Sequence, residues 1–396
     1  AFNGCDRLKR RGRMKLKITA ATLLLAFAAA LCACSVTPLD GVPADRINPI
    51  SDAAFIEPQF VNHAVTRLLY EQLSPVEQLF YRHFYNCVFS HPEYIAVPSG
   101  IDGETVKRVF VALKYDNPHL LCLKNSYRLM TFGDKDFVRP DYAFSAKTCG
   151  EKTHELDVRA SALTGNAKQF SGDFGKEVYL HDELIKGCTY DGTKTMSTAY
   201  DALIAGRSAC GGYAMGMKLL LDKAGIKSAA VSGSAGTDGE KAPHMWLCVN
   251  ADGEWYHLDP TWDDPVGAEM HTPLHGWFNV TSEAINATHS DYTLPKNVRC
   301  NSVQGEYYNK KGLFCDGNND AAVIEKSLKN AFADGNFAEI KYRDGDEMKL
   351  AAAELFEDGG IDSYLESVGY PEETRVSYTE NTTMSVLYIY VHNREE

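Results

Sequence analysis

The chain has 396 residues, more than one ordinary domain holds, so we expect two or three domains of roughly 100–200 residues each. Its apolar content of 44% supports packed cores, and its formal net charge of −13 argues against a nucleic-acid partner, because phosphate groups would be repelled. After residue 34 no apolar run reaches the ~20 residues that span a bilayer.

The N-terminal segment has the layout of a secretory signal peptide. From Met14 a short basic start is followed by an apolar stretch and a small-residue site. The letters LCAC, which end at Cys34, resemble a bacterial lipobox, in which the last cysteine is lipidated after cleavage. We therefore expect an exported lipoprotein on the bacterial cell envelope, with Cys34 as its lipidation site. We expect an over-extended gene start over residues 1–13, a signal peptide over residues 14–33 and a tether over residues 34–50.

Residues 51–150 are expected to form a helix-rich N-terminal module that carries no reactive cluster. Ser74 and Glu77 have the spacing of a capping box around Pro75, which suits the first helical position, so a helix should begin there. A second helix is predicted over residues 104–113.

A second domain is predicted over residues 155–295. Helices are predicted over residues 178–187, 195–204 and 210–224, and the last should end at Gly225, the usual residue of a left-handed cap. Strands are predicted over residues 228–231, 244–250 and 254–259. Residues 300–396 should form a separate small α+β unit. Its predicted elements are a helix over residues 321–332, a strand over 337–342, a broken helix over 347–365, and two strands over 374–379 and 384–391.

Cys210 is the candidate nucleophile. It stands at the predicted start of a helix, where unpaired N–H groups and the positive end of the helix dipole favour a thiolate. Gly211 and Gly212 follow it and leave little bulk over the sulfur. Buried cysteines are common, so this position alone would identify only a small core residue.

A predicted hairpin brings a base and an acid together. Asp252-Gly253 is a two-residue turn signal between the strands that carry His244 and Asp259. A turn at that pair would place the two side chains two residues out of register on one face, and a turn at Ala251-Asp252 would place them directly opposite. Either register leaves their β-carbons about 4.5–8 Å apart, so the carboxylate could orient the imidazole. With Cys210 they predict a thiol catalytic triad.

Other arrangements on the same face remain open. A turn at Asp252-Gly253 would set Cys248 opposite His257, and the two could pair or join His244 and Asp259 in a metal site. Their spacing matches no common zinc pattern, so neither a metal nor a cofactor is predicted. In the plainest interpretation, His244 is a satisfied strand histidine and Asp259 caps the next turn.

The residues resemble the bacterial transglutaminase-like domain. Three blocks occur in the right order: CGGYA from Cys210, HMW from His244, and WYHLD from Trp255 followed by TWDDP. The resemblance implies an α+β fold with a papain-like core, in which the helix that bears the cysteine packs on an antiparallel sheet. An N-terminal helical module and a small C-terminal α+β unit would flank this core. The positions of Cys210, His244 and Asp259 match the family's triad.

The resemblance implies a thiol enzyme that acts on amide bonds of proteins or peptides through a thioester, either a cysteine peptidase or an acyltransferase. Gly211, Trp246 and Trp262 are its predicted substrate contacts. Leu247 stands where the family usually has asparagine, which would alter the cleft wall. The alternative is a surface binding or scaffold protein that keeps the fold without turnover. Expected partners are a protein or peptide substrate, the lipid anchor and the cell wall.

Overall fold

A computed structural model describes residues 37–38, 47–194, 197–237, 239–265, 272–317 and 319–392. The predicted start, the signal peptide and the lipidation site at Cys34 lie outside these residues, and so does part of the tether. The chain divides into two compact units. The larger unit comprises the described residues up to Pro273 together with residues 289–302, and the smaller comprises Leu274–Thr288 and the described part of Val303–Glu396. None of the helices in this part of the chain qualifies, by length and hydropathy, as a membrane span.

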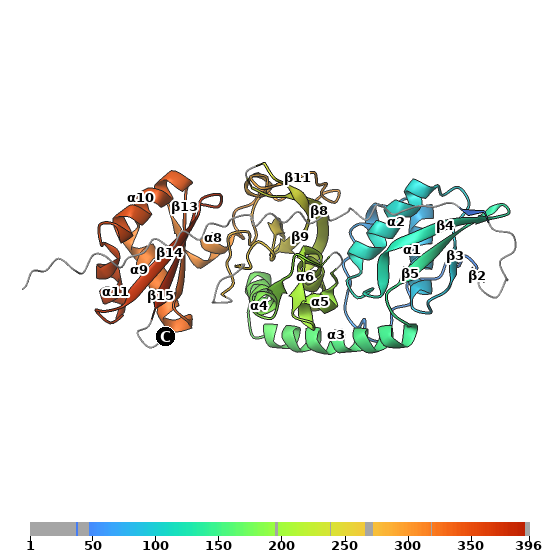
Figure 1. Ribbon diagram of the computed structural model, residues 1–396, viewed down its shortest axis with the longest axis horizontal. Helices are drawn as coiled ribbons and strands as arrows, with labels where there is room; N and C mark the ends of the chain where they lie inside the picture. The colour runs from blue at the N-terminus through green and yellow to red at the C-terminus, as the bar shows by residue number, and fades with distance from the viewer. Residues whose placement is uncertain are drawn as a thin grey trace, which may run out of the picture. The chain divides into compact units, whose positions relative to one another are not determined.

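The larger unit begins with two helices that share a core with a sheet (Figure 1). Helix α1, Pro75–Val88, begins where the sequence predicts, and its capping box is present, with the Ser74 N–H donating to Glu77 at 2.7 Å. Helix α2 spans Gly103–Asp116 and follows a short 3₁₀ helix at Tyr70–Gln72. A five-stranded sheet of order β1-β4-β5-β3-β2 accompanies them. Its strands are Thr37–Pro38 (β1), Ile47–Asn48 (β2), Tyr94–Ala96 (β3), Leu123–Phe132 (β4) and Lys135–Tyr142 (β5).

This sheet is a feature that the prediction of a helix-rich module did not contain. The pairing of β4 with β5 shifts register between Leu123 and Tyr127. A bulge of that kind breaks the alternation of buried and exposed side chains that identifies a strand in a sequence. The module is therefore α+β.

Helix α3, Ala146–Ala167, joins this module to the next region. It runs through residues 150–155, the interval between the two predicted domains, and packs on the helices that follow it. A disulfide between Cys122 and Cys149 links α3 to the start of β4. No helix is predicted here because the buried stripe of α3 has few large apolar residues: Cys149, Thr153, Leu156, Ala160, Leu163, Thr164 and Ala167.

The centre of the larger unit is a buried helix on an antiparallel sheet, as the sequence predicts (Figure 1). Helix α6 spans the predicted Cys210–Ala224, ends at Gly225 with φ of +80°, and packs on β8 and β9. The sheet has the order β10-β9-β8-β11, with strands Lys227–Ala235 (β8), Ala242–Ala251 (β9), Glu254–Leu258 (β10) and His289–Ser290 (β11). Preceding α6 are Gly172–Lys186 (α4), Thr189–Tyr190 (β6), Ala199–Leu203 (α5) and Arg207–Ser208 (β7).

The turn of the β9–β10 hairpin decides between the two predicted registers. Asp252 and Gly253 both have positive φ, at 52° and 92°, and Ala251 pairs with Glu254. This is the register in which Asp252-Gly253 forms the turn, and it is confirmed. Positive φ at both central positions belongs to the turn whose twist matches that of the flanking strands.

The smaller unit is α+β, as predicted. Its sheet has the order β12-β13-β15-β14 and shares a core with helices α9, α10 and α11. The elements are Ser282–Ile285 (α7), Tyr307–Lys311 (α8), Phe314–Cys315 (β12), Ala321–Asp334 (α9), Phe337–Tyr342 (β13), Gly345–Phe356 (α10), Ile361–Val368 (α11), Arg375–Asn381 (β14) and Val386–His392 (β15). Leu274–Thr288 belongs to this unit too, and His275 Nδ1 lies 2.7 Å from Glu339 Oε1 on β13. The chain thus enters the unit, leaves it for residues 289–302 and returns.

Candidate active site

Cys210 is the first residue of α6 and is 4% exposed. The N-cap residue, Ala209, has no side-chain acceptor for the first N–H groups of the helix, which begins at the thiol. The turn before the helix packs closely against it. A β-carbon on Gly212 would lie 1.9 Å from Ser208 Oγ and 2.8 Å from the Thr198 carbonyl oxygen, so only glycine fits there.

His244 on β9 and Asp259, just after β10, are in direct contact. His244 Nε2 lies 2.6 Å from Asp259 Oδ2, and the imidazole also interacts electrostatically with Cys210. Burial opposes the imidazolium charge, but the interactions with Asp259 and Cys210 outweigh it and raise the pKa of His244 to about 10. The structure therefore brings the three predicted triad residues together, with the proton on the imidazole at neutral pH.

A second imidazole, that of His289 on β11, binds the same carboxylate oxygen. His289 Nε2 lies 3.0 Å from Asp259 Oδ2, and Oδ1 accepts backbone N–H bonds from Thr261 at 3.0 Å and Trp262 at 3.3 Å. Asp259 thus caps the following turn with one oxygen and meets two histidines with the other. Burial opposes ionisation, but His244 and His289 together hold the pKa of Asp259 below its usual range.

Sequence reasoning missed His289. The residue lies 30 positions beyond Asp259 in a strand of only two residues. No motif or turn signal surrounds it, so a lone histidine gave nothing to recognise.

The predicted substrate contacts lie in different surroundings. Trp246 is 0% exposed and stacks behind His244, with ring centroids 6.0 Å apart at 19°, so it supports the base from the interior. Trp262 is half-buried and meets His244 edge-on at 6.2 Å. Gly211 is buried in the first turn of α6, where a β-carbon would lie 3.4 Å from the Ser197 carbonyl oxygen.

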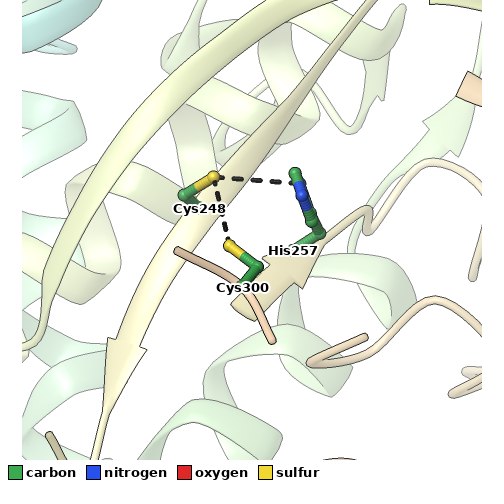
Figure 2. Close-up of side chains that lie close together, drawn as sticks. All are labelled: Cys248, His257 and Cys300. Carbon is green, nitrogen blue, oxygen red and sulfur yellow. Dashed lines mark hydrogen bonds between the residues drawn. The ribbon is translucent and has the colours of Figure 1, made fainter. Parts of the chain in front are cut away.

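Behind Trp246 lies a second cluster, drawn in Figure 2. Cys248 Sγ lies 3.9 Å from Cys300 Sγ and 3.8 Å from His257 Nδ1, and all three side chains are fully buried. The same Nδ1 accepts the indole N–H of Trp246 at 3.0 Å. Because that lone pair is already used, the cluster fits a satisfied hydrogen-bond network better than a metal site. Burial, with Cys300 beside it, raises the pKa of the Cys248 thiol well above its ordinary value.

The metal arrangement left open by the sequence required four side chains in one place. Among the described residues, the ligand atoms instead fall into separate groups, with Cys248, His257 and Cys300 in one and His244, Asp259 and His289 in another. In the second group both histidines already bind the carboxylate. The four side chains of that alternative therefore do not converge on one ion.

Two tyrosines from outside the predicted triad lie near the thiol. Tyr115 on α2 and Tyr190 on β6 both interact electrostatically with Cys210. Burial raises the pKa of each phenol, that of Tyr190 to about 12, so both stay protonated at neutral pH. On α6 itself, Tyr213 donates to Asp264 at 2.5 Å and holds the loop after Asp259 against the helix.

Residues 160–260 match the transglutaminase-like superfamily. All three residues of the predicted triad fall inside the matched segment, and its helix-on-sheet core has the expected α+β fold. This part of the chain is similar to transglutaminase-like domains, and the similarity supports a thiol enzyme in general. Comparison with curated proteins gives no match.

Several solved structures are similar over part of the chain. A candidate cysteine protease from Cytophaga hutchinsonii is 20% identical over 26% of this chain and 37% of its own, with a TM-score of 0.22. A TGase is 14% identical over 45% and 52%, with a TM-score of 0.25. The periplasmic domain of TgpA from Pseudomonas aeruginosa is 19% identical over 32% and 55%, with a TM-score of 0.22. The chain thus spans about half or less of their lengths.

Proposed function

We propose that the transglutaminase-like domain is a cell-envelope thiol enzyme that acts on amide bonds of proteins or peptides. Cys210 is the nucleophile, His244 the general acid and base, and Asp259 the acid that orients the imidazole. One observation carries the proposal: the 2.6 Å contact between His244 Nε2 and Asp259 Oδ2, beside a thiol at the start of α6. A paired, charged imidazole next to a helix N-terminus favours the thiolate.

The reaction has two halves. The Cys210 thiolate attacks the amide carbonyl carbon, and the backbone N–H of Cys210 is the proposed donor to the resulting oxyanion. The imidazolium of His244 then gives its proton to the leaving amine as the C–N bond breaks, which leaves a thioester. In the second half His244 removes a proton from water or from a primary amine as it attacks the thioester, and the thiolate leaves. Water gives hydrolysis, which we modestly favour, and an amine gives acyl transfer.

The proposed location rests on the sequence of residues 14–34 alone. We propose that the protein is exported, is lipidated at Cys34 and meets its substrate at the envelope, where it could also contact the cell wall. Metabolic labelling with a fatty acid would test the anchor in the producing cell. Labelling that persists unchanged in Cys34→Ala would rule this anchor out.

The experiment that tests the activity is incubation of the full chain with a peptide library and a labelled primary amine, read by mass spectrometry. Cleavage identifies a peptidase, and incorporation of the amine identifies an acyltransferase. Both should disappear in Cys210→Ala and persist in Cys188→Ala, which removes another buried thiol of the same domain. Silence in both assays would favour the scaffold alternative.

Alkylation tests the site without a known substrate. Iodoacetamide should modify Cys210 rapidly at neutral pH, and this fast reaction should be lost in His244→Ala, because the thiolate loses its counter-charge. Labelling of Cys210 no faster than that of a free cysteine would contradict the proposal.

A further inference from the structure

The side chain that joins the triad without belonging to its motif is His289. It is 1% exposed, and β11 places it through the pairing of His289 with Ala235 on β8. Its Nε2 lies 3.0 Å from Asp259 Oδ2, the oxygen that His244 meets at 2.6 Å. The two imidazoles therefore approach one carboxylate oxygen from two elements of the sheet.

Rings on three sides fix the orientation of the His289 imidazole. Trp246 meets it edge-on with centroids 4.8 Å apart, Trp262 lies tilted at 5.0 Å, and His244 lies at 5.4 Å. Trp246 is itself held, because its indole N–H donates to His257 Nδ1 within the cluster of Figure 2. The ring has little freedom to turn away from Asp259.

The charge of the site decides what His289 can contribute. Burial lowers the pKa of His289 below its ordinary value against the opposing effect of Asp259, and His244 and His257 also disfavour its charge. A neutral imidazole whose Nε2 faces a carboxylate is a hydrogen-bond donor through Nε2–H. The positive charge of the site is thus left to His244.

Asp259 needs such a donor because it is a fully buried carboxylate. The backbone N–H groups of Thr261 and Trp262 bind only Oδ1, so they leave the second oxygen to the imidazoles. Without His289, Oδ2 would rely on His244 alone, the residue that must exchange protons during the reaction. A second donor that does not take part in proton transfer would keep the carboxylate in place throughout.

We propose that His289 is a positioning residue: a neutral imidazole that donates to Asp259 Oδ2 and holds this carboxylate in contact with His244. The proposal rests on the proposed thiol chemistry of Cys210 for its purpose, but its geometric content concerns Asp259 and His244 alone. It predicts that the loss of the donor loosens the ion pair of His244 with Asp259. Residues that orient metal ligands in the same way change activity by about 10- to 100-fold when removed, and we take that range as the guide here.

The test compares His289→Asn with His289→Gln in the full chain labelled with ¹⁵N-histidine. The amide nitrogen of glutamine can take the place of Nε2, whereas that of asparagine ends short of Asp259. In His289→Asn we expect the pKa of His244 to fall by about one unit or more towards its ordinary value, and alkylation of Cys210 at pH 7 to slow about tenfold or more. His289→Gln should restore most of both properties. His154→Gln, at an exposed position, controls for the loss of a histidine elsewhere.

The outcomes separate this inference from the proposed function. A His244 titration in His289→Asn that is unchanged, or moved upward, overturns the positioning role even if the variant melts at a lower temperature. If wild-type Cys210 reacts no faster than a free cysteine, the proposed function fails, while the titration of His244 still decides the role of His289. Should His289→Asn not fold, His289→Phe keeps the ring volume without the donor and must give the same downward shift.

Discussion

At the scale of single residues, Asp259 shows how one buried carboxylate organises the candidate site. One oxygen caps a turn through two backbone N–H groups, and the other meets two imidazoles. The plain interpretation of Asp259 as a turn cap and its interpretation as a triad acid are therefore compatible. Because the carboxylate stays ionised, the titrating proton of the site belongs to His244.

The raised pKa of His244 predicts the alkaline limit of turnover. Protonation of the leaving amine needs the imidazolium, so we expect turnover to fall with an apparent pKa of about 10. The folded pKa is raised above the ordinary 6.5, so the stabilisation from this proton is complete below pH 6.5 and lost as the pH rises through about 10. Rates and denaturation midpoints measured between about pH 6 and 11 check both statements. An alkaline limb near neutral pH would contradict them.

Gly212 predicts a steric effect in the first turn of α6. In Gly212→Ala the new β-carbon would meet Ser208 Oγ at 1.9 Å and the Thr198 carbonyl oxygen at 2.8 Å. We expect the free energy of unfolding to fall by about 1–3 kcal/mol, measured by urea denaturation. Gly216→Ala in the same helix is the matched control, since its nearest neighbours would lie 3.4 Å away. Equal effects of the two substitutions would refute the steric explanation.

At the scale of elements, the sequence correctly predicted helices and strands that have start, stop or turn signals of their own. Helix α6 has the predicted bounds, and the hairpin of β9 and β10 has one of the two predicted registers. Elements without such signals were missed. Helix α3 buries a stripe of mostly small residues, and β4 contains a register shift, so neither shows the expected periodicity.

The N-caps of helices α3 and α4 differ, and this difference predicts how substitution of each cap residue affects stability. Ser145 begins α3 and its hydroxyl accepts the Thr148 N–H at 3.2 Å, whereas Ser171 begins α4 without a side-chain cap bond. We expect Ser145→Ala to lower the free energy of unfolding by about 0.5–2 kcal/mol and Ser171→Ala to have a much smaller effect. Thermal and urea denaturation of both variants measures the difference. A Ser145→Ala variant as stable as the wild type would show that the observed cap does not stabilise α3.

At the scale of the whole molecule, the chain crosses between its two units more than once. Leu274–Thr288 belongs to the smaller unit although it precedes residues 289–302 of the larger one. Its ring contacts illustrate the reason: His275 stacks on Tyr307 at 3.7 Å, and Phe278 is fully buried. A division at one point in the sequence therefore cannot separate the units.

Truncation after Ser302 tests this arrangement. The shortened chain keeps Cys210, His244, Asp259 and His289 but removes the residues against which Leu274–Thr288 packs. We expect proteases to cut within residues 274–288 at least about tenfold faster than in the full chain, because buried apolar side chains become exposed. Iodoacetamide labelling of Cys210 serves as the control and should change little. Retained protection of the segment would contradict the division into units.

The sequence by itself determined the features that local chemistry encodes. The sequence predicted a cysteine at the start of a helix. It also predicted a two-residue turn that places His244 on the same face as Asp259. Both features depend on short stretches of sequence with a clear periodicity and clear turn residues. Only the tertiary structure decided that His289 joins the same carboxylate, that Trp246 lies behind the base, and that Leu274–Thr288 packs with the C-terminal unit. These depend on which distant surfaces pack together, and that choice follows from the burial of the whole chain, which no local pattern records.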